Sequence, residues 1–309
     1  MSIEDTAITT TVVRAPFNRE EIMNTFHINY RPPAWLLAFS LSALVVGCGG
    51  GSSVTHDDTT LPPLVSSTSA ATSVDLGAAA TFGAGSGTGL TNQGTSTNVD
   101  GDLGGPVAST LITGFHDSTT VFTETPLNIG NVTGTIYTNT DPAADGGMTA
   151  GSVGGALSTA YDALSAPAQG PGSDPGAGEL GGLRLAAGVW TSASGAFQIT
   201  QQDLILDAQN DPDAVWVFQM ASSLTVGDTA ARSVTLINGA QAKNVFWAVG
   251  SAATINGAGG GTMVGTIIAP SGVTFSTAGN AAITTLNGRA FGFPGSVTMV
   301  NTAINVPAP

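Results

Sequence analysis

Residue types that commonly carry catalysis are scarce in this chain, and the densest group of them is acidic. The stretch DLILDAQNDPDAVW holds Asp203, Asp207, Asp211 and Asp213. Two carboxylates can hydrolyse a glycosidic bond when one acts as acid and the other as base or nucleophile. Aspartates are also favoured in turns, and QNDPDA is rich in turn-forming residues. We therefore favour turn capping. A calcium site is the alternative, although the calcium-binding nonapeptide repeat is absent.

Other catalytic and metal-binding patterns are missing. His116 in GFHDST is the only histidine after residue 72, and no cysteine follows Cys48. A His/Cys metal cluster, a Ser–His–acid nucleophile, an H-E-x-x-H pair and a P-loop are therefore not predicted. Lys243 and Arg289 are expected to cap carbonyl groups or to pair with an acid. The sequence predicts no enzyme, no cofactor and no metal.

The composition excludes nucleic acid as a partner. The chain has 309 residues, a formal net charge of −14 and only 9% charged residues. Four basic residues against 17 acidic ones follow Gly49, which is too few for a phosphate-binding surface. A chain of this length is still long enough to bury a substantial core in one or two domains.

The N-terminal segment is typical of an export signal. A cation, Arg31, precedes an apolar run over 34–46, and the sequence VVGC ends at Cys48. The run is too short for a comfortable membrane span but suits a signal-peptide core. VVGC is typical of a bacterial lipobox, in which Cys48 becomes the lipidated first residue. Ordinary secretion with cleavage nearby is the alternative, and either Met1 or Met23 is the start.

These features predict three regions. Residues 1–47 are a signal peptide that is removed, and 48–72 form a Gly/Ser/Thr-rich tether. The folded domain then covers 73–309. The protein is expected outside the cytoplasm, secreted or lipid-anchored at the cell surface, with membrane contact only through the anchor.

One helix is predicted, at about 148–166. Apolar side chains recur on one helical face of MTAGSVGGALSTAYDALSAP, and Pro167 ends the pattern. Its members are Val153, Leu157, Ala160, Tyr161 and Leu164. Glycine and alanine are abundant, so an isolated helix would be weak. We expect it to lie closely against a flat surface.

The last third of the chain contains an internal repeat. Four segments align without gaps: WVFQMASSLTV (216–226), VFWAVGSAATI (245–255), GTIIAPSGVTF (265–275) and RAFGFPGSVTM (289–299). Each has an apolar strand, a turn of small residues and an apolar–Thr–apolar strand. A period of roughly 20–30 residues with this content is typical of a β-solenoid.

The second strand of each repeat predicts a ladder of threonines. Its apolar residues alternate with Thr225, Thr254, Thr274 and Thr298. Stacked coils would place these threonines about 4.8 Å apart on an outer face. Asn256 and Ser276, two positions further along, are expected to face the same way. Exposed threonine is also common in ordinary strands, so the ladder does not by itself define a function.

The first strand of each repeat is apolar on both sides. Phe218, Trp247, Ile267 and Phe291 are predicted to share the core side. The opposite side needs a second cover, and the 148–166 helix is the candidate. Trp190, Trp216 and Trp247 are expected in the core.

Several stretches together resemble the ice-binding protein domain of cold-adapted bacteria, sea-ice diatoms and snow-mould fungi. They are LRLAAGVWTS, DLILDAQNDPDAVWVFQMASSLTV, NGAQAKNVFWAVGSAATI, GTIIAPSGVTF and TLNGRAFG. The resemblance covers nearly all of 73–309. It implies a mainly β fold, a discontinuous right-handed β-solenoid of triangular cross-section with one long α-helix alongside. It also implies that late coils stack on early ones.

The function implied by the resemblance is adsorption to ice through one flat face, with inhibition of ice growth and recrystallisation. A Thr-Ala/Gly-x-Thr/Asn motif, frequent in active members, occurs once, at Thr277, Ala278, Gly279 and Asn280. The expected ice-binding residues are Thr225, Thr254, Asn256, Thr274, Ser276, Thr277, Ala278, Asn280 and Thr298. The chain is expected to act as a monomer. A cell-surface adhesion module that binds polysaccharide or a partner cell is the alternative, and a solenoid enzyme is a third hypothesis.

Overall fold

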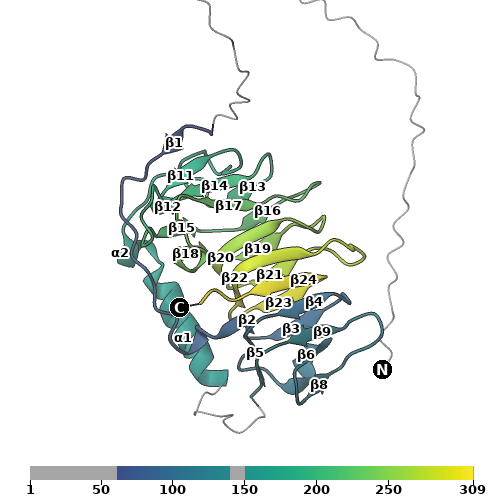
Figure 1. Ribbon diagram of the computed structural model, residues 1–309. Coiled ribbons are helices and arrows are strands. Elements are labelled where there is room, and N and C mark those ends of the chain that lie inside the picture. The colour runs from purple at the N-terminus through teal and green to yellow at the C-terminus, as the bar shows by residue number, and fades with distance from the viewer. Residues whose placement is uncertain (1–60, 140–149, 309) are drawn as a thin grey trace, which may run out of the picture. The chain divides into compact units, whose positions relative to one another are not determined.

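The computed structural model describes residues 61–139 and 150–308, which belong to one compact unit, Asp58–Pro309. Its strands are 2 to 9 residues long and, among the described strands, pair in parallel except for β7 with β8. Figure 1 shows them stacked in rows with a helix along one side. Short strands separated by turns follow from apolar runs interrupted by Gly, Asn and Pro.

Two of the three sheets have simple paths. A four-stranded sheet contains β1 (Leu64–Val65), β11 (Arg184–Ala186), β14 (Leu204–Asp207) and β17 (Val234–Ile237). A seven-stranded sheet, called the ladder sheet here, contains β13 (Phe197–Ile199), β16 (Leu224–Val226), β19 (Ala252–Ile255), β21 (Gly272–Phe275), β23 (Ser296–Met299), β3 (Gly89–Asn92) and β6 (Ile112–Thr113).

The third sheet has 13 strands and forks. Its main path is β12 (Gly188–Thr191), β15 (Trp216–Met220), β18 (Val245–Val249), β20 (Thr262–Ile268), β22 (Thr284–Gly292), β24 (Thr302–Asn305), β4 (Thr97–Val99), β9 (Gly130–Val132), β7 (Phe115–His116) and β8 (Val121–Phe122). The branch is β2 (Phe82–Ser86), β5 (Asp102–Gly104) and β10 (Ile136–Tyr137).

The fork lies within β22. Its first half pairs with β24 and its last residues pair with β2. Gly288 separates the halves, and a Cβ there would lie 1.9 Å from the carbonyl oxygen of Gly265. Only glycine permits this close approach of two backbones. The 13-stranded sheet therefore contributes strands to two sides of the solenoid.

The chain order is not the coil order. In the ladder sheet β23, near the C-terminus, pairs with β3 from the N-terminal part. In the 13-stranded sheet β24 likewise pairs with β4. Figure 1 shows the yellow C-terminal strands beside the blue N-terminal ones. The structure confirms the mainly β, discontinuous solenoid that the resemblance implied.

A single apolar core runs along the inside of the coils. Trp190, Trp216 and Trp247 are fully buried, as the sequence predicts. Phe218 stacks on Trp247 with ring centroids 4.0 Å apart and an interplanar angle of 8°. The Trp247 indole N–H donates to the carbonyl oxygen of Val264 at 2.9 Å. Such ladders of stacked core side chains fix the relative positions of neighbouring coils.

The predicted helix is present. Helix α1 spans Ala150–Ala163, and the short α2 spans Ala166–Gln169. Three-residue 3₁₀ helices are η1 (Gly77–Ala79), η2 (Ser109–Leu111) and η3 (Ala242–Asn244). The predicted apolar residues of the helix are buried, with Tyr161 half-buried. They form a second cluster with Phe82, Val217, Phe246, Ala248, Ile268 and Phe291. The helix therefore covers the outer side of β15, β18, β20, β22 and β2, as expected.

Phe291 corrects the gap-free repeat alignment. Ile267 pairs with Ala290, and Ile268 with Phe291. Ala290 therefore takes the core position, whereas Phe291 belongs to the helix-side cluster. Because Val273 pairs with Val297, the turn between the strands is one residue longer in this coil. A slip of one residue moves a side chain to the opposite face.

The folded domain also starts earlier than predicted. Leu64 and Val65 pair with β11, and the Ser67 hydroxyl donates to the carbonyl oxygen of Val189 at 2.6 Å. The expectation of a free tether up to Thr72 is therefore wrong for its last residues. The predicted signal peptide and Cys48 lie outside the described residues.

Candidate functional site

The four predicted threonines lie in one straight row. Thr225 pairs with Thr254, Thr254 with Thr274, and Thr274 with Thr298, each in parallel register on the ladder sheet. Thr254 and Thr274 are exposed, and the other two are half-buried. The predicted stacking is confirmed. Neighbouring rungs stand about 4.8 Å apart, as in any parallel pair of strands.

The row is longer than the sequence predicted. Thr298 pairs with Thr91, and Thr91 with Thr113. At the other end Thr225 pairs with Gln198. Six threonines therefore follow one another on six adjacent strands. The repeat alignment did not include Thr91 and Thr113, because their coils come early in the chain. Both follow an apolar residue, as Leu-Thr and Ile-Thr, which is the signal that could have identified them.

Most hydroxyls of the row are available to water. Those of Thr225, Thr254, Thr274 and Thr298 make no hydrogen bond to any described residue. The exception is at the end of the row, where the Thr113 hydroxyl donates to the Thr91 hydroxyl at 3.4 Å. The branched side chain of threonine is stiff at χ1. The row thus presents methyl and hydroxyl groups in a fixed arrangement.

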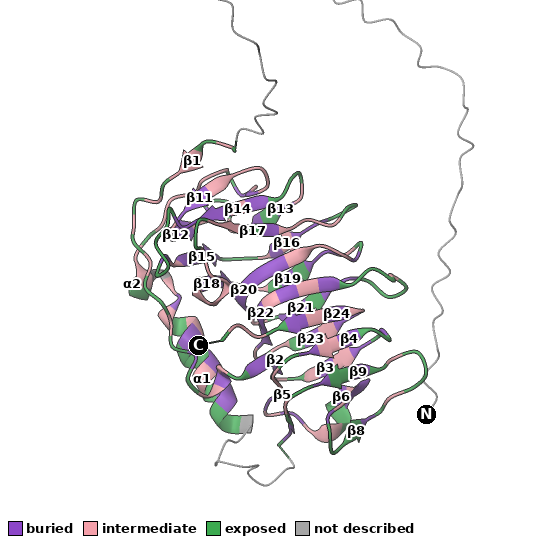
Figure 2. Cartoon of the chain, viewed as in Figure 1, coloured by how far each residue is buried: buried purple, intermediate pink, exposed green. Residues whose placement is uncertain are grey.

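The buried residues beneath the row of threonines keep the threonine side chains at a common height. On either side of each threonine, the neighbours in the same strand are buried, as in the alternation of β19 and β21. Figure 2 shows this alternation of buried and exposed positions along the strands. The inward residues belong to the common core. An outward side chain can therefore shift little unless a whole coil moves.

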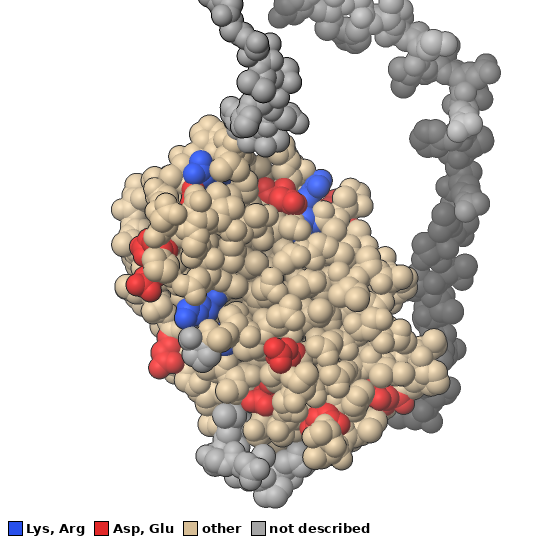
Figure 3. Space-filling view, viewed as in Figure 1, with Lys and Arg blue, Asp and Glu red and all other residues tan. Residues whose placement is uncertain are grey.

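A second outward column makes the surface flat. Two positions before the threonines, Ala252 pairs with Gly272, Gly272 with Ser296, and Ser296 with Gly89. This column holds only alanine, serine and two glycines, of which Gly272 is buried. None of the seven strands contains a charged residue. In the view of Figure 3 charged side chains form small separate groups on a mostly uncharged surface.

The prediction that Asn256 and Ser276 face outward with the threonines is wrong, because both residues are buried. Asn256 is 0% exposed and has a φ of +47°. Its side chain accepts a hydrogen bond from the Arg232 N–H at 2.8 Å and donates to the Arg232 carbonyl oxygen at 2.9 Å. Ser276 is 2% exposed with a φ of +59°. The chain turns into a left-handed conformation at these corners, so the simple alternation of the strand ends there.

The motif Thr277-Ala278-Gly279-Asn280 forms a turn just after β21. The Asn280 N–H donates to the Thr277 carbonyl oxygen at 3.1 Å, and the first three residues are exposed. The Asn280 amide donates to the Gly257 carbonyl oxygen at 2.7 Å and to the Ser276 hydroxyl at 3.2 Å. Asn280 therefore anchors the turn to the adjacent coil, while Thr277 and Ala278 are exposed beside the end of β21.

The acidic stretch has structural contacts. Asp203 accepts a hydrogen bond from the Ser233 N–H at 2.8 Å, and Asp211 accepts one from the Asp213 N–H at 2.9 Å. These contacts confirm turn and coil capping for both carboxylates. His116 lies 2.7 Å from Glu124, measured between Nδ1 and Oε1. Among the described residues no group of three His, Cys, Asp or Glu is placed to hold a metal ion.

Asp207 is buried against a cation from the neighbouring coil. It accepts hydrogen bonds from the Arg184 Nε at 2.8 Å, the Gln209 N–H at 2.9 Å and the Asn238 amide at 2.7 Å. Burial alone would raise the pKa of Asp207, but these hydrogen bonds and the Arg184 charge together lower it. This carboxylate is a structural anion.

Fold and surface together define a class of protein: a β-solenoid that presents a rigid, flat and uncharged array of threonines. The family model that matches the chain, over residues 84–305, is described as ice-binding-like. With 35% identity over 225 residues, an ice-binding protein of Nostoc sp. aligns with 72% of this chain and 71% of its own. One from Leucosporidium sp. is 32% identical, over 77% of this chain and 86% of its own.

Solved structures agree with these matches. The ice-binding protein of the Antarctic ascomycete Antarctomyces psychrotrophicus superposes with a TM-score of 0.61 and 30% identity, covering 77% of this chain and all of that one. A domain of Shewanella frigidimarina ice-binding protein 1 gives a TM-score of 0.64 at 25% identity. This chain belongs to the ice-binding-like family.

Proposed function

We propose that this protein binds ice through the ladder sheet, and that adsorption there slows ice growth and recrystallisation. The observation that carries the proposal is the register of Thr225, Thr254, Thr274, Thr298 and Thr91 on adjacent strands. Relatives that are named ice-binding proteins, and that align with most of this chain, support it. Thr113 continues the row beyond Thr91, and the proposed site also includes Thr277, which is exposed in the turn after β21.

The mechanism follows from preorganisation. The hydroxyls repeat about 4.8 Å apart across strands, beside a column of small side chains nearly 7 Å away along each strand. A fixed grid of this kind can hold water in an ice-like order at little entropic cost on docking. Lys or Glu side chains would keep their own hydration and would move, which would blur the order. The absence of charge from these seven strands is consistent with this requirement.

The comparisons give no support to a polysaccharide-binding adhesion module. Trp190, Trp216 and Trp247, which could have stacked on sugar rings, are buried. The family whose model matches this chain is described as ice-binding-like, which argues against a solenoid enzyme.

We further propose that the protein acts as a monomer outside the cytoplasm, secreted or lipid-anchored through Cys48. The N-terminal sequence supports this proposal. No helix in the described part of the chain is long and apolar enough to span a bilayer.

The ladder is tested by making it uneven. In a chain covering 58–309, Thr254→Tyr and Thr274→Tyr each place a bulky ring on the surface without touching the core. We expect each to lower thermal hysteresis about fivefold or more, because the ring holds the remaining grid away from ice. Fluorescence-based ice-plane affinity of the parent chain gives the independent readout of binding.

The matched control is Thr235→Tyr, since Thr235 is exposed on β17 in a different sheet. It should leave thermal hysteresis unchanged. All three variants should melt within about 2 °C of the parent, as surface substitutions usually do. Full activity in both ladder variants would exclude the ladder from the site, whereas a parent chain that does not bind ice would refute the function itself.

A further inference from the structure

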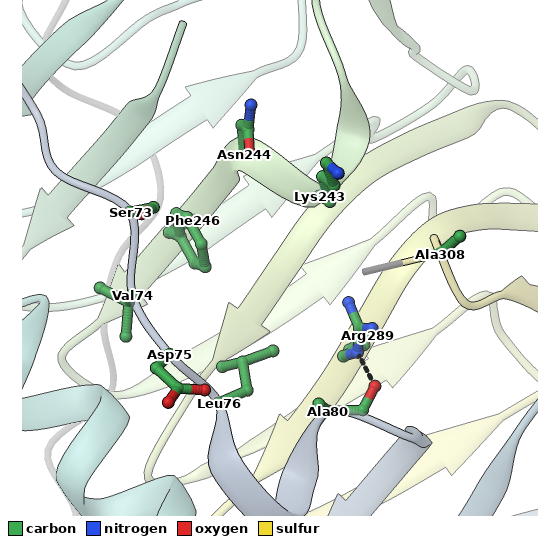
Figure 4. A pocket seen from close by; sticks show the side chains of 10 residues that line it. All are labelled: Ser73, Val74, Asp75, Leu76, Ala80, Lys243, Asn244, Phe246, Arg289 and Ala308. Carbon is green, nitrogen blue, oxygen red and sulfur yellow. Dashed lines mark hydrogen bonds between the residues drawn. The ribbon is translucent and has the colours of Figure 1, made fainter. Parts of the chain in front are cut away.

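A cavity of about 260 Å³ lies away from the ladder sheet. It opens where the segment around η1, the start of β18, β22 and the C-terminal residues meet (Figure 4). Its lining includes Val74, Asp75, Leu76, Lys243, Phe246 and Arg289. None of them belongs to the surface proposed to bind ice.

Arg289 is a buried cation in the wall of this cavity. It is 4% exposed, and burial lowers its pKa. Its Nε donates to the Ala80 carbonyl oxygen at 2.9 Å and its Nη2 donates to the Pro307 carbonyl oxygen at 3.1 Å. Buried guanidinium groups usually have a carboxylate partner. Within the described residues Arg289 forms no ion pair, so neutral carbonyls are its only counterparts there.

A second cation lines the same cavity. Lys243, half-buried in η3 just before the start of β18, makes no hydrogen bond or ion pair with any described residue. Asp75 is the only acid in the lining. Its carboxylate accepts a hydrogen bond from the Gly77 N–H at 2.8 Å, and in Figure 4 Leu76 lies between Asp75 and Arg289. Among the described residues, the two cations therefore have no acidic partner on the cavity side.

The remaining wall is apolar. Leu76 is 7% exposed and Phe246 is 2% exposed, and Val74 lies beside them in the lining. A concave site that joins an apolar wall to a few charged donors is typical of small-molecule recognition. Guanidinium groups bind carboxylates strongly because two N–H donors match the two oxygens.

We propose that this cavity binds a small organic carboxylate, with Arg289 and Lys243 facing the carboxylate and Val74, Leu76 and Phe246 contacting its apolar part. The ligand connects the N-terminal segment, β22 and the C-terminal residues. It therefore stabilises the junction on which the chain's non-sequential coil order depends, because binding to the folded state alone raises stability.

Benzoate and benzamide form the test pair, since they share a shape and differ in charge. Calorimetric titration of the 58–309 chain should give saturable benzoate binding, and benzamide should bind about tenfold more weakly or not at all. Benzoate should also raise the melting temperature. Equal affinity for the two compounds, or no benzoate binding up to about 10 mM, would overturn the proposal.

Lys243→Gln is the informative variant, because Arg289 also ties two backbone carbonyls and its loss could impair folding. Lys243→Gln should weaken benzoate binding about three- to tenfold while leaving thermal hysteresis unchanged. Arg232→Gln removes the same charge outside the cavity and should leave benzoate affinity within twofold. An effect of equal size in both variants would show a general influence of net charge and would contradict a site here.

Discussion

At the scale of single residues, the clearest stabilising contact between neighbouring coils is the ion pair of Arg184 with Asp207. Asp207 is fully buried, and Arg184 is held on the adjacent strand β11 in the same sheet. A buried carboxylate of lowered pKa stabilises the folded state only while it is ionised. Its contribution is complete above the unfolded-state pKa of about 3.9 and is lost as the pH falls toward the lower pKa of the folded state.

Asp207→Asn should therefore destabilise the protein in a pH-dependent way. At pH 7 we expect the free energy of unfolding to fall by about 3 kcal/mol, because the fully buried carboxylate loses its charge and its pairing with the partly buried Arg184. Below about pH 4 the difference from the parent should shrink. Urea unfolding at a series of pH values measures both effects.

Asp228→Asn is the control, since Asp228 is exposed and its side chain makes no hydrogen bond or ion pair with any described residue. It should change the free energy of unfolding by less than about 0.5 kcal/mol. A loss in Asp207→Asn that stays constant from pH 7 to pH 2 would show that packing, and not ionisation, is responsible.

Single residues also show where prediction from the sequence pattern fails. The outward position of Thr225, Thr254 and Thr274 follows from the two-residue period of a strand. Asn256 and Ser276 stand at the next outward positions by that period, yet they are buried. The period fails because both residues have positive φ, which depends on how the solenoid turns its corner.

At the scale of elements, helix α1 depends on close contact with the sheet that it covers. Gly154 and Gly155 are adjacent in the helix and differ in surroundings. A Cβ at Gly154 would lie 3.0 Å from the Phe293 ring, whereas a Cβ at Gly155 would meet nothing within 4 Å. The first glycine permits packing, and the second faces open space.

Gly154→Leu and Gly155→Leu are therefore a matched pair. Gly154→Leu should lower the free energy of unfolding by about 1–3 kcal/mol, because the new side chain overpacks the contact. Gly155→Leu should be neutral or stabilise by up to about 1 kcal/mol, since leucine favours the helix more than glycine does. Chemical denaturation measures both. Equal losses would mean that the helix is not packed through Gly154.

The helix and the solenoid strands were predictable because their apolar periods are strong. The pairing partner of each strand was harder to predict from the sequence. The gap-free alignment of its segment predicts Phe291 in the core, but the turn after it is one residue longer than in the preceding coil. Turn length is set by backbone geometry at the corner, so the apolar pattern alone did not reveal the shift.

At the scale of the whole molecule, strands from both ends of the chain meet in the middle of the stack. β23 lies between β21 and β3, and β24 lies between β22 and β4. These pairings join two blocks of coils that come from distant parts of the sequence. The stability of the solenoid should therefore depend more on its last strands than on its first.

Two truncations of the 58–309 chain test this. Ending the chain at Gly295 removes β23 and β24, and we expect it to abolish the cooperative thermal transition because β21 and β3 lose their shared partner. Starting at Ser67 removes only the end strand β1, and should lower the melting temperature by about 5 °C or less. Circular dichroism during heating measures both. A chain ending at Gly295 that melts as cooperatively as the parent would show that the two blocks fold separately.

This arrangement also makes one late strand decisive for the continuity of the threonine row. Translation delivers Thr298 after every other threonine of the row, yet its place is between Thr274 and Thr91. A chain that ends before β23 lacks Thr298 and leaves Thr274 and Thr91 without the strand that joins them. By the proposed function, a copy truncated before β23 would offer ice two short surfaces in place of one long one.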